Sequence, residues 1–281
     1  MIRIIFYAQP IVIGAGGYMQ RLEGLMRKAL QQYNMISAGD HICIGVSGGK
    51  DSVALTIGLA NLRNYFEHPF KITALTLDPC FGGVESDYTR LEQLFAKHNV
   101  PYVIKRSNIG RIVFDERAEQ NPCALCAKMR RGLLHDTALE LGCNKIALGH
   151  HLDDAIETFF MNLFREGRIG CFSPVTYLSR KQLTMIRPML LATESEVVRA
   201  VRRAELPIVK SLCPADGATT RQETKEFVHQ KVKEDPAFRQ KMLGALQKSG
   251  IDGWAPVCSG CRQSKKEAIE DAVRKTLLGR N

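Results

Sequence analysis

The fold of this 281-residue chain is decided by the stretch Ile42-Cys43-Ile44-Gly45-Val46-Ser47-Gly48-Gly49-Lys50-Asp51-Ser52. Its first part is apolar and suits a buried strand, and residues 53–65 after it show a helical pattern. Between them lies the glycine loop (residues 47–52), whose glycines let the backbone approach a ligand while helix-terminal N–H groups attract anions. Lys50 and the hydroxyls of Ser47 and Ser52 complete a predicted phosphate site. The spacing matches neither a Walker A loop nor a dinucleotide fingerprint.

Strands and helices alternate along the chain up to about residue 190. Further strands are predicted at 72–77, 101–105, 145–148 and 183–186, and helices at 19–35, around Leu91 and Phe95, at 124–141 and at 152–164. This order predicts an α/β fold with a Rossmann-like parallel sheet covered by helices on both faces, followed by a basic helical C-terminal region. Ser47, Asp78 and Gly149 end three strands and are expected to converge where such sheets bind ligands.

Nine cysteines are scattered over the chain, an odd number that argues against a secreted disulfide framework. A cytoplasmic protein with thiolate chemistry or metal ligation is the expected alternative. Cys123 and Cys126 form a CxxC motif at the predicted start of a helix, where nearby Lys128, Arg130 and Arg131 are expected to lower the thiol pKa. By itself this motif fits half a zinc site, a redox pair or a chance occurrence.

A second polar motif, Gly149-His150-His151-Leu152-Asp153-Asp154, falls at a predicted strand-to-helix turn. Two adjacent carboxylates suit Mg²⁺ held together with ATP phosphates. The alternative for one of them is a helix N-cap. The motif therefore predicts a weak magnesium site at Asp153 and Asp154.

Together these motifs resemble the tRNA 2-thiocytidine synthetase family of the PP-loop ATP pyrophosphatase superfamily. The resemblance runs from about residue 19 to residue 228 and includes S-G-G-K-D-S, P-C-x-L-C-x-x-x-R-R-G, L-G-H-H-x-D-D-x-x-x-T and Ile186-Arg187-Pro188. It implies an ATP-dependent transferase that adenylates the C2 oxygen of a pyrimidine in tRNA, most simply a cytidine of the anticodon loop, and replaces it with sulfur. The ATP-binding residues implied are Ser47, Gly48, Gly49, Lys50, Asp51, Ser52, Asp78 and Gly149.

The resemblance also implies a [4Fe–4S] cluster held by three cysteines. Carried over, the ligands are Cys123, Cys126 and Cys213, since only one cysteine remains where familiar members have a second CxxC. Three thiolates leave one iron open, where a sulfide can bind and act as a nucleophile. The expected catalytic set is Cys126, Cys213, Lys50 and Asp154. A cluster-free alternative uses Cys126 and Cys213 as a persulfide carrier and a resolving thiol.

Four segments are expected. Residues 1–18 form an N-terminal extension, which is either an added strand or the product of a start codon placed too early. Residues 19–190 form the PP-loop domain, and 191–250 a basic helical region that carries Cys213. In the tail, 251–281, Cys258 and Cys261 form a second CxxC motif. This pair binds Zn²⁺ together with the same pair of a second subunit, takes part in redox chemistry, or has no ligand.

The net charge of +10 is uneven: residues 197–281 carry 17 Lys and Arg against 10 Asp and Glu, a net charge of +7. A basic segment predicts a polyanionic partner, and the resemblance names it as tRNA, with Arg130, Arg131, Arg202 and Arg203 as RNA-binding residues. A sulfur donor, either a cysteine desulfurase or free sulfide, is a further expected partner, and no membrane association is expected. The resemblance is also compatible with a homodimer. The alternatives are a thiolase for uridine, a PP-loop ligase that amidates tRNA, and a non-catalytic RNA-binding protein.

Overall fold

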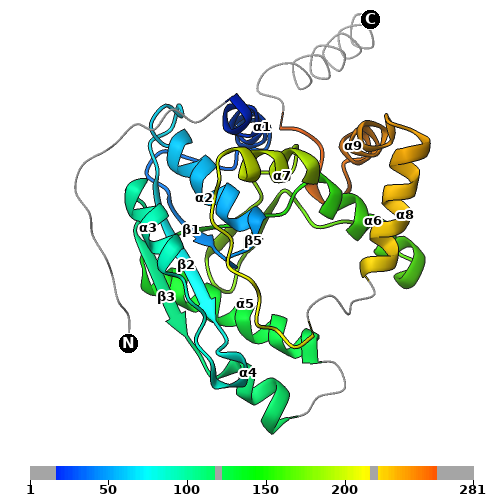
Figure 1. Ribbon diagram of the computed structural model, residues 1–281. Coiled ribbons are helices and arrows are strands. Elements are labelled where there is room, and N and C mark those ends of the chain that lie inside the picture. The colour runs from blue at the N-terminus through cyan, green and yellow to red at the C-terminus, as the bar shows by residue number, and fades with distance from the viewer. Residues whose placement is uncertain (1–16, 118–121, 216–220, 258–281) are drawn as a thin grey trace, which may run out of the picture.

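The computed structural model describes residues 17–117, 122–215 and 221–257 of the chain (Figure 1). Its centre is a six-stranded sheet with the order β3-β2-β1-β4-β6-β5. Neighbouring strands are parallel, except that β5 runs antiparallel to β6. The strands are β1 (His41–Gly45), β2 (Lys71–Asp78), β3 (Tyr102–Arg106), β4 (Lys145–Ala147), β5 (Val175–Leu178) and β6 (Leu183–Ile186).

Helices cover both faces of the sheet. Their bounds are α1 (Gly17–Gln32), α2 (Lys50–Leu62), α3 (Thr89–Lys97), α5 (Pro122–Glu140), α6 (Leu152–Glu166), α7 (Glu194–Arg203), α8 (Arg221–Glu234) and α9 (Phe238–Ser249), with short turns α4 (Ile109–Arg111), η1 (Phe81–Gly83), η2 (Ile112–Glu116) and η3 (Ile251–Gly253). The larger core joins the sheet to α1, α2, α3 and α7, and a second core joins its other face to α5. Figure 1 shows α5 on the opposite side of the sheet from α1, α2 and α7. The α/β class predicted from sequence is therefore confirmed.

The strand order places a ligand crevice beside β1. The chain runs outward from β1 to β2 and β3 and then returns to the other side of β1 as β4. Such a reversal of strand order leaves a crevice outside the carboxyl ends of the two diverging strands. The glycine loop follows β1 and Gly149 follows β4, so both loops border this crevice.

The C-terminal helices pack against α6 and α1. Phe160 of α6 lies 5.2 Å from Phe227 of α8 and 6.1 Å from Phe238 of α9, measured between ring centroids. Trp254 is fully buried, and its Nε1 donates a hydrogen bond to the Phe172 carbonyl at 2.9 Å. Its ring meets the ring of Tyr33 edge-on. The expected tail thus begins with a segment, 251–257, that packs against the domain.

Two sequence expectations need correction. The helix expected from residue 53 begins at Lys50, because Gly49 takes the extended N-cap conformation and residues 50–52 form the first turn. The sheet expected to be parallel has an antiparallel edge strand, β5, which is only four residues long. An antiparallel edge strand is a common addition to such sheets. Cys258, Cys261 and residues 1–16 lie outside the described residues.

None of the helices in the described ranges is both long and apolar enough to cross a bilayer.

Candidate active site

The glycine loop is held in shape by its own serines. Ser52 Oγ accepts a hydrogen bond from the Ser47 N–H at 3.1 Å and donates one to the Gly49 carbonyl at 2.9 Å. The hydroxyls of Ser47 and Ser52 lie 3.2 Å apart. Both side chains therefore shape the loop, whereas the sequence analysis predicted that their hydroxyls bind phosphate directly. The N–H groups at the start of α2 remain the anion-attracting part of the loop.

Two close contacts bring other segments onto the glycine loop. A Cβ at Gly149 would lie 3.1 Å from the Asp51 carbonyl carbon, so the turn after β4 packs directly on the first turn of α2. Gly48 has a φ of +85°, and a Cβ there would lie 2.9 Å from the Val209 Cβ. The Val209 N–H donates a hydrogen bond to the Gly48 carbonyl at 3.0 Å. Val209 belongs to the closing segment (residues 204–213), which ends at Cys213.

Lys50 lies in a network of charges that joins three helices. Its Nζ lies 2.9 Å from Asp51 Oδ2 and 3.1 Å from Glu194 Oε1, at the start of α7. Glu194 also pairs with Lys225 of α8 at 3.0 Å. Burial raises the pKa of Glu194, but hydrogen bonds and charges from Lys225 and Lys50 outweigh it and lower that pKa to about 2. Burial lowers the pKa of Lys50, and Asp51 and Glu194 together raise it above its ordinary value.

A cavity of about 240 Å³ lies above this network, next to the crevice between β1 and β4. Its wall is polar and comes from four helices and the turn before α6: Lys50, Asp51, His151, Asp154, Glu157, Glu194, Gln222 and Lys225. His151 is the N-cap of α6, and its N–H donates to Asp154 Oδ2 at 2.8 Å in a reciprocal capping box. Asp154 therefore both caps the helix and faces the cavity.

The neighbouring Asp153 has a structural role. It is 1% exposed and accepts hydrogen bonds from the Glu194 N–H at 2.7 Å and from Arg239 Nε at 2.6 Å. Both of its carboxylate oxygens accept hydrogen bonds within the protein, which disfavours the expected magnesium role, and Asp154 is the carboxylate of the pair that lines the cavity. Asp153 instead joins α6 to α7 and α9.

Asp78, expected among the ATP-binding residues, is buried at the end of β2. Its two carboxylate oxygens accept hydrogen bonds from the Cys80 N–H at 3.1 Å and from the Ser86 N–H at 3.0 Å. It therefore shapes the loop after β2, which lies on the same edge of the sheet as the glycine loop. Cys80 itself has a φ of 50° in this loop.

The three cysteines assigned to a cluster lie near one another. Cys123 is exposed, Cys126 is buried and Cys213 is half-buried, and all three are free thiols. Burial raises the pKa of Cys126, and Arg130 lowers it, while the charges of Cys213 and Cys123 raise it further. The expected lowering of the thiol pKa is therefore wrong for Cys126, because burial outweighs the adjacent arginine. Both other thiols are close enough to act on Cys126.

Within the described ranges, no three His, Cys, Asp or Glu side chains are arranged as a group that could hold a metal ion. The cysteines would have to draw together to ligate one. The predicted RNA-binding residues divide into two groups: Arg130 and Arg131 lie on α5, and Arg202 and Arg203 lie on α7, across the sheet.

Sequence reasoning did not place Glu194, Lys225 or Arg239 in the charge network around Lys50 and Asp153. The only local signal was the Thr193 to Glu196 capping box, which marks the start of α7 but says nothing about Lys50. The connection between Glu194 and the glycine loop is a tertiary contact across 144 residues.

Replacing Glu194 by glutamine is expected to lower the free energy of unfolding at neutral pH by about 2 to 3 kcal/mol. Its pKa falls from 4.5 to about 2 on folding, so this stabilisation is present above pH 4.5 and is lost as the pH falls toward 2. The measurement is urea unfolding of both proteins across the acidic pH range in which they stay folded. Glu205→Gln, exposed just beyond the same helix, is the control. A difference that does not shrink with falling pH contradicts the assignment.

Known proteins resemble this chain in sequence and in fold. Residues 21–231 match the PP-loop domain family. A tRNA-cytidine(32) 2-sulfurtransferase from Syntrophotalea carbinolica is 36% identical over 230 residues, covering 81% of this chain and 88% of that protein. Another from Pelobacter propionicus is 35% identical, covering 81% and 85%. Among solved structures, the U34-tRNA thiolase NcsA from Methanococcus maripaludis with its [4Fe–4S] cluster has a TM-score of 0.69 at 22% identity, covering 87% of this chain and 81% of that chain.

The fold and the glycine loop thus define an α/β protein with a PP-loop domain. Within that class, the chain belongs to the family of tRNA-cytidine(32) 2-sulfurtransferases. The resemblance found in the sequence motifs is confirmed, and the structural similarity to NcsA shows the shared fold.

Proposed function

We propose that this protein is an ATP-dependent tRNA sulfurtransferase that replaces the C2 oxygen of a cytidine in the anticodon loop with sulfur. The observation that carries the proposal is the contact between Val209 and Gly48, because it brings the cysteine-bearing closing segment onto the glycine loop. The activation and the sulfur chemistry then share one crevice. The names of the curated relatives agree with this substrate.

ATP is needed because the C2 oxygen of a pyrimidine is a very poor leaving group. That oxygen attacks the α-phosphorus of ATP and pyrophosphate leaves; sulfide then attacks C2, and AMP leaves. Where a cysteine desulfurase is the donor, a cellular thiol supplies the two electrons that reduce its persulfide sulfur to the level of sulfide. The α2 N–H groups and Lys50 bind the departing pyrophosphate. Lys50 is held ready by Asp51 and Glu194 at the mouth of the 240 Å³ cavity.

Mg²⁺ suits one face of this cavity. Magnesium takes one or two carboxylates together with phosphate oxygens, and Asp154 presents such a carboxylate toward the cavity. Asp51 lines the same cavity, with Oδ2 bound to Lys50. Asp154 is therefore the magnesium ligand we propose, in place of the pair expected from sequence.

The thiols fit an iron–sulfur cluster by the chemistry of the donor set. Cys123 and Cys213 are both near enough to raise the pKa of Cys126, and thiolates are the ligands that [4Fe–4S] clusters use. Cys123, Cys126 and Cys213 would hold it. When bound, such a cluster supplies an iron with an open position for sulfide. Arg130 contributes positive charge that favours the thiolate form of Cys126.

Deleting the gene is expected to remove 2-thiocytidine from cellular tRNA, with recovery on expression of the wild-type chain. The measurement is mass spectrometry of nucleosides from digested tRNA. Loss of a thiouridine with 2-thiocytidine intact would support the uridine alternative. Retention of every thionucleoside would contradict the proposal.

A further inference from the structure

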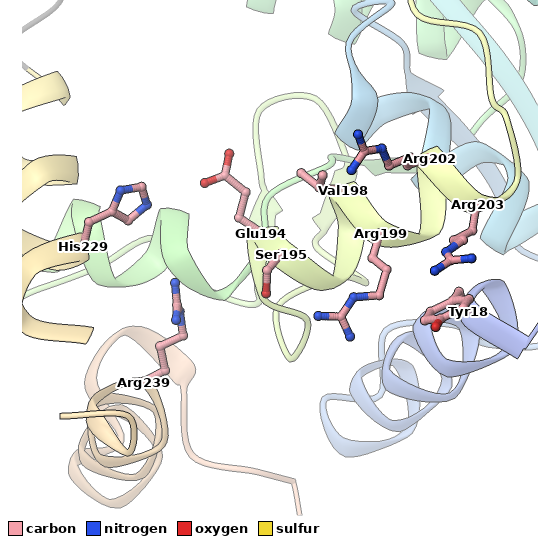
Figure 2. Close-up of a pocket in the computed structure, with 9 residues that line it drawn as sticks. All are labelled: Tyr18, Glu194, Ser195, Val198, Arg199, Arg202, Arg203, His229 and Arg239. Carbon is pink, nitrogen blue, oxygen red and sulfur yellow. The ribbon is translucent and has the colours of Figure 1, made fainter. Parts of the chain in front are cut away.

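A second and larger cavity lies on the other side of Glu194. Its volume is about 870 Å³, more than three times that of the cavity beside Lys50. Figure 2 shows it between α7 and the neighbouring helices α1, α8 and α9. Its lining is Tyr18, Glu194, Ser195, Val198, Arg199, Arg202, Arg203, His229 and Arg239. We call it the arginine cavity.

The helical period explains how α7 builds this wall. Val197, Ala200 and Val201 face the core and are buried. Ser195, Val198, Arg199 and Arg202 recur at positions i, i+3, i+4 and i+7, so they share the opposite face and line the cavity. One exposed face of α7 is thus cationic from Arg199 to Arg203.

Within the described residues, the charge of this cavity is only partly balanced. Arg239 pairs with Asp153, and Glu194 pairs with Lys50 and Lys225, so these two cavity residues are already compensated. Across the described residues, no ion pair engages Arg199, Arg202 or Arg203. The guanidinium of Arg203 lies instead over the ring of Tyr18, 5.1 Å from its centroid. In the part of the chain that the structure describes, three arginines therefore face the cavity without an ion-pair partner.

We propose that the arginine cavity binds the sugar–phosphate backbone of the RNA substrate. This inference rests on the proposed function, and it assigns to the tRNA a surface distinct from the glycine loop and the cysteines. Guanidinium groups bind phosphate oxygens through paired N–H donors, and a partly exposed aromatic ring such as Tyr18 offers a base a stacking surface. Because Glu194 lines both cavities, the bound backbone lies next to the nucleotide.

The test uses the full-length protein with charge reversals in the cavity. Arg199→Glu/Arg203→Glu is expected to weaken binding of an unmodified tRNA transcript at least about tenfold and to reduce the slope of log affinity against log salt by about 2, one per phosphate contact. Equilibrium binding is measured by fluorescence anisotropy across a salt series. Arg90→Glu/Lys97→Glu, two exposed cations on α3, imposes the same change in net charge as a matched control.

A milder variant distinguishes the loss of a phosphate contact from misfolding. Arg199→Gln/Arg203→Gln removes the charge without reversing it and is expected to shift affinity and salt slope in the same direction by less. ATP affinity should stay at the wild-type value in both cavity variants, and thiolation should recover at raised tRNA concentration. Equal tRNA binding by the cavity and α3 variants would overturn the inference.

The same experiment separates this inference from the proposed function. A wild-type protein that forms 2-thiocytidine, beside cavity variants with normal tRNA binding, refutes the cavity assignment alone. A wild-type protein that binds tRNA through the cavity but forms no thionucleoside supports the cavity and refutes the sulfurtransferase proposal. Cavity variants that lose affinity for ATP as strongly as for tRNA would also overturn the inference, by making the cavity part of the nucleotide site.

Discussion

Replacing Cys126 by serine is expected to reduce thiolation of tRNA to background while leaving ATP binding at its wild-type level. A serine hydroxyl neither ligates iron as a thiolate does nor carries a sulfur atom. Cys126 lies on α5, in a hydrophobic cluster with Ile109 and Val113 whose described members include no residue of α2 or α7, so its loss leaves Lys50 and the glycine loop intact. The measurements are 2-thiocytidine formed on purified tRNA and equilibrium binding of ATP.

The matched control is Cys171→Ser. Cys171 is as buried as Cys126, its thiol donates to the Ala155 carbonyl, and its pKa is raised to about 12, mainly by burial. The Cys171→Ser variant is expected to thiolate tRNA at the wild-type rate. Thiolation by Cys126→Ser at the control rate would contradict the assignment.

Iron and sulfide content, read together with activity, separates the two sulfur chemistries. Anaerobically purified wild-type protein is expected to contain iron and sulfide, and serine at Cys123, Cys126 or Cys213 is expected to remove most of both. An iron-free wild type with full activity would contradict the cluster and favour the persulfide alternative through Cys126 and Cys213.

Replacing Gly48 by alanine is expected to lower kcat/KM for ATP at least about tenfold, which corresponds to about 1.4 kcal/mol. A side chain at a φ of +85° is strained by about 1 to 2 kcal/mol, and the new Cβ would meet the Val209 Cβ at 2.9 Å. The loop and the closing segment would have to separate. The measurements are ATP binding and the steady-state kinetics of thiolation.

A double variant divides this effect into its two causes. Val209→Gly removes the Cβ that collides with alanine but leaves the backbone strain, so Gly48→Ala/Val209→Gly is expected to recover part of the loss. Gly24→Ala, on α1 with open space around the new Cβ, is the control and is expected to retain activity. Wild-type kinetics for Gly48→Ala would show that the closing segment does not depend on this contact.

The sequence predicted those parts of the site whose signals are local. The strand–glycine–helix order of residues 42–65 identifies an anion-binding loop, because each residue's role depends on its immediate neighbours. The convergence of Ser47 and Gly149 also followed, since the carboxyl ends of parallel strands meet at one edge. The direct packing of Gly149 on Asp51 agrees with that expectation.

Contacts between distant segments were beyond sequence reasoning. Asp153 and Asp154 are equivalent in sequence, and only the positions of Arg239 and Glu194 decide that Asp153 is buried in a structural role. The pKa of Cys126 was predicted in the wrong direction for a similar reason. Adjacent arginines are visible in the sequence, whereas burial of the thiol depends on tertiary packing.

The buried contacts of Asp153 bear on how the protein unfolds. A single carboxylate at 1% exposure holds the first turn of α6, the start of α7 and a side chain of α9. Detaching α9 from the rest would leave this charge buried without its cation, which is strongly unfavourable. We therefore expect α9 and the nucleotide crevice to unfold together, so that the ATP site does not outlast the detachment of α9.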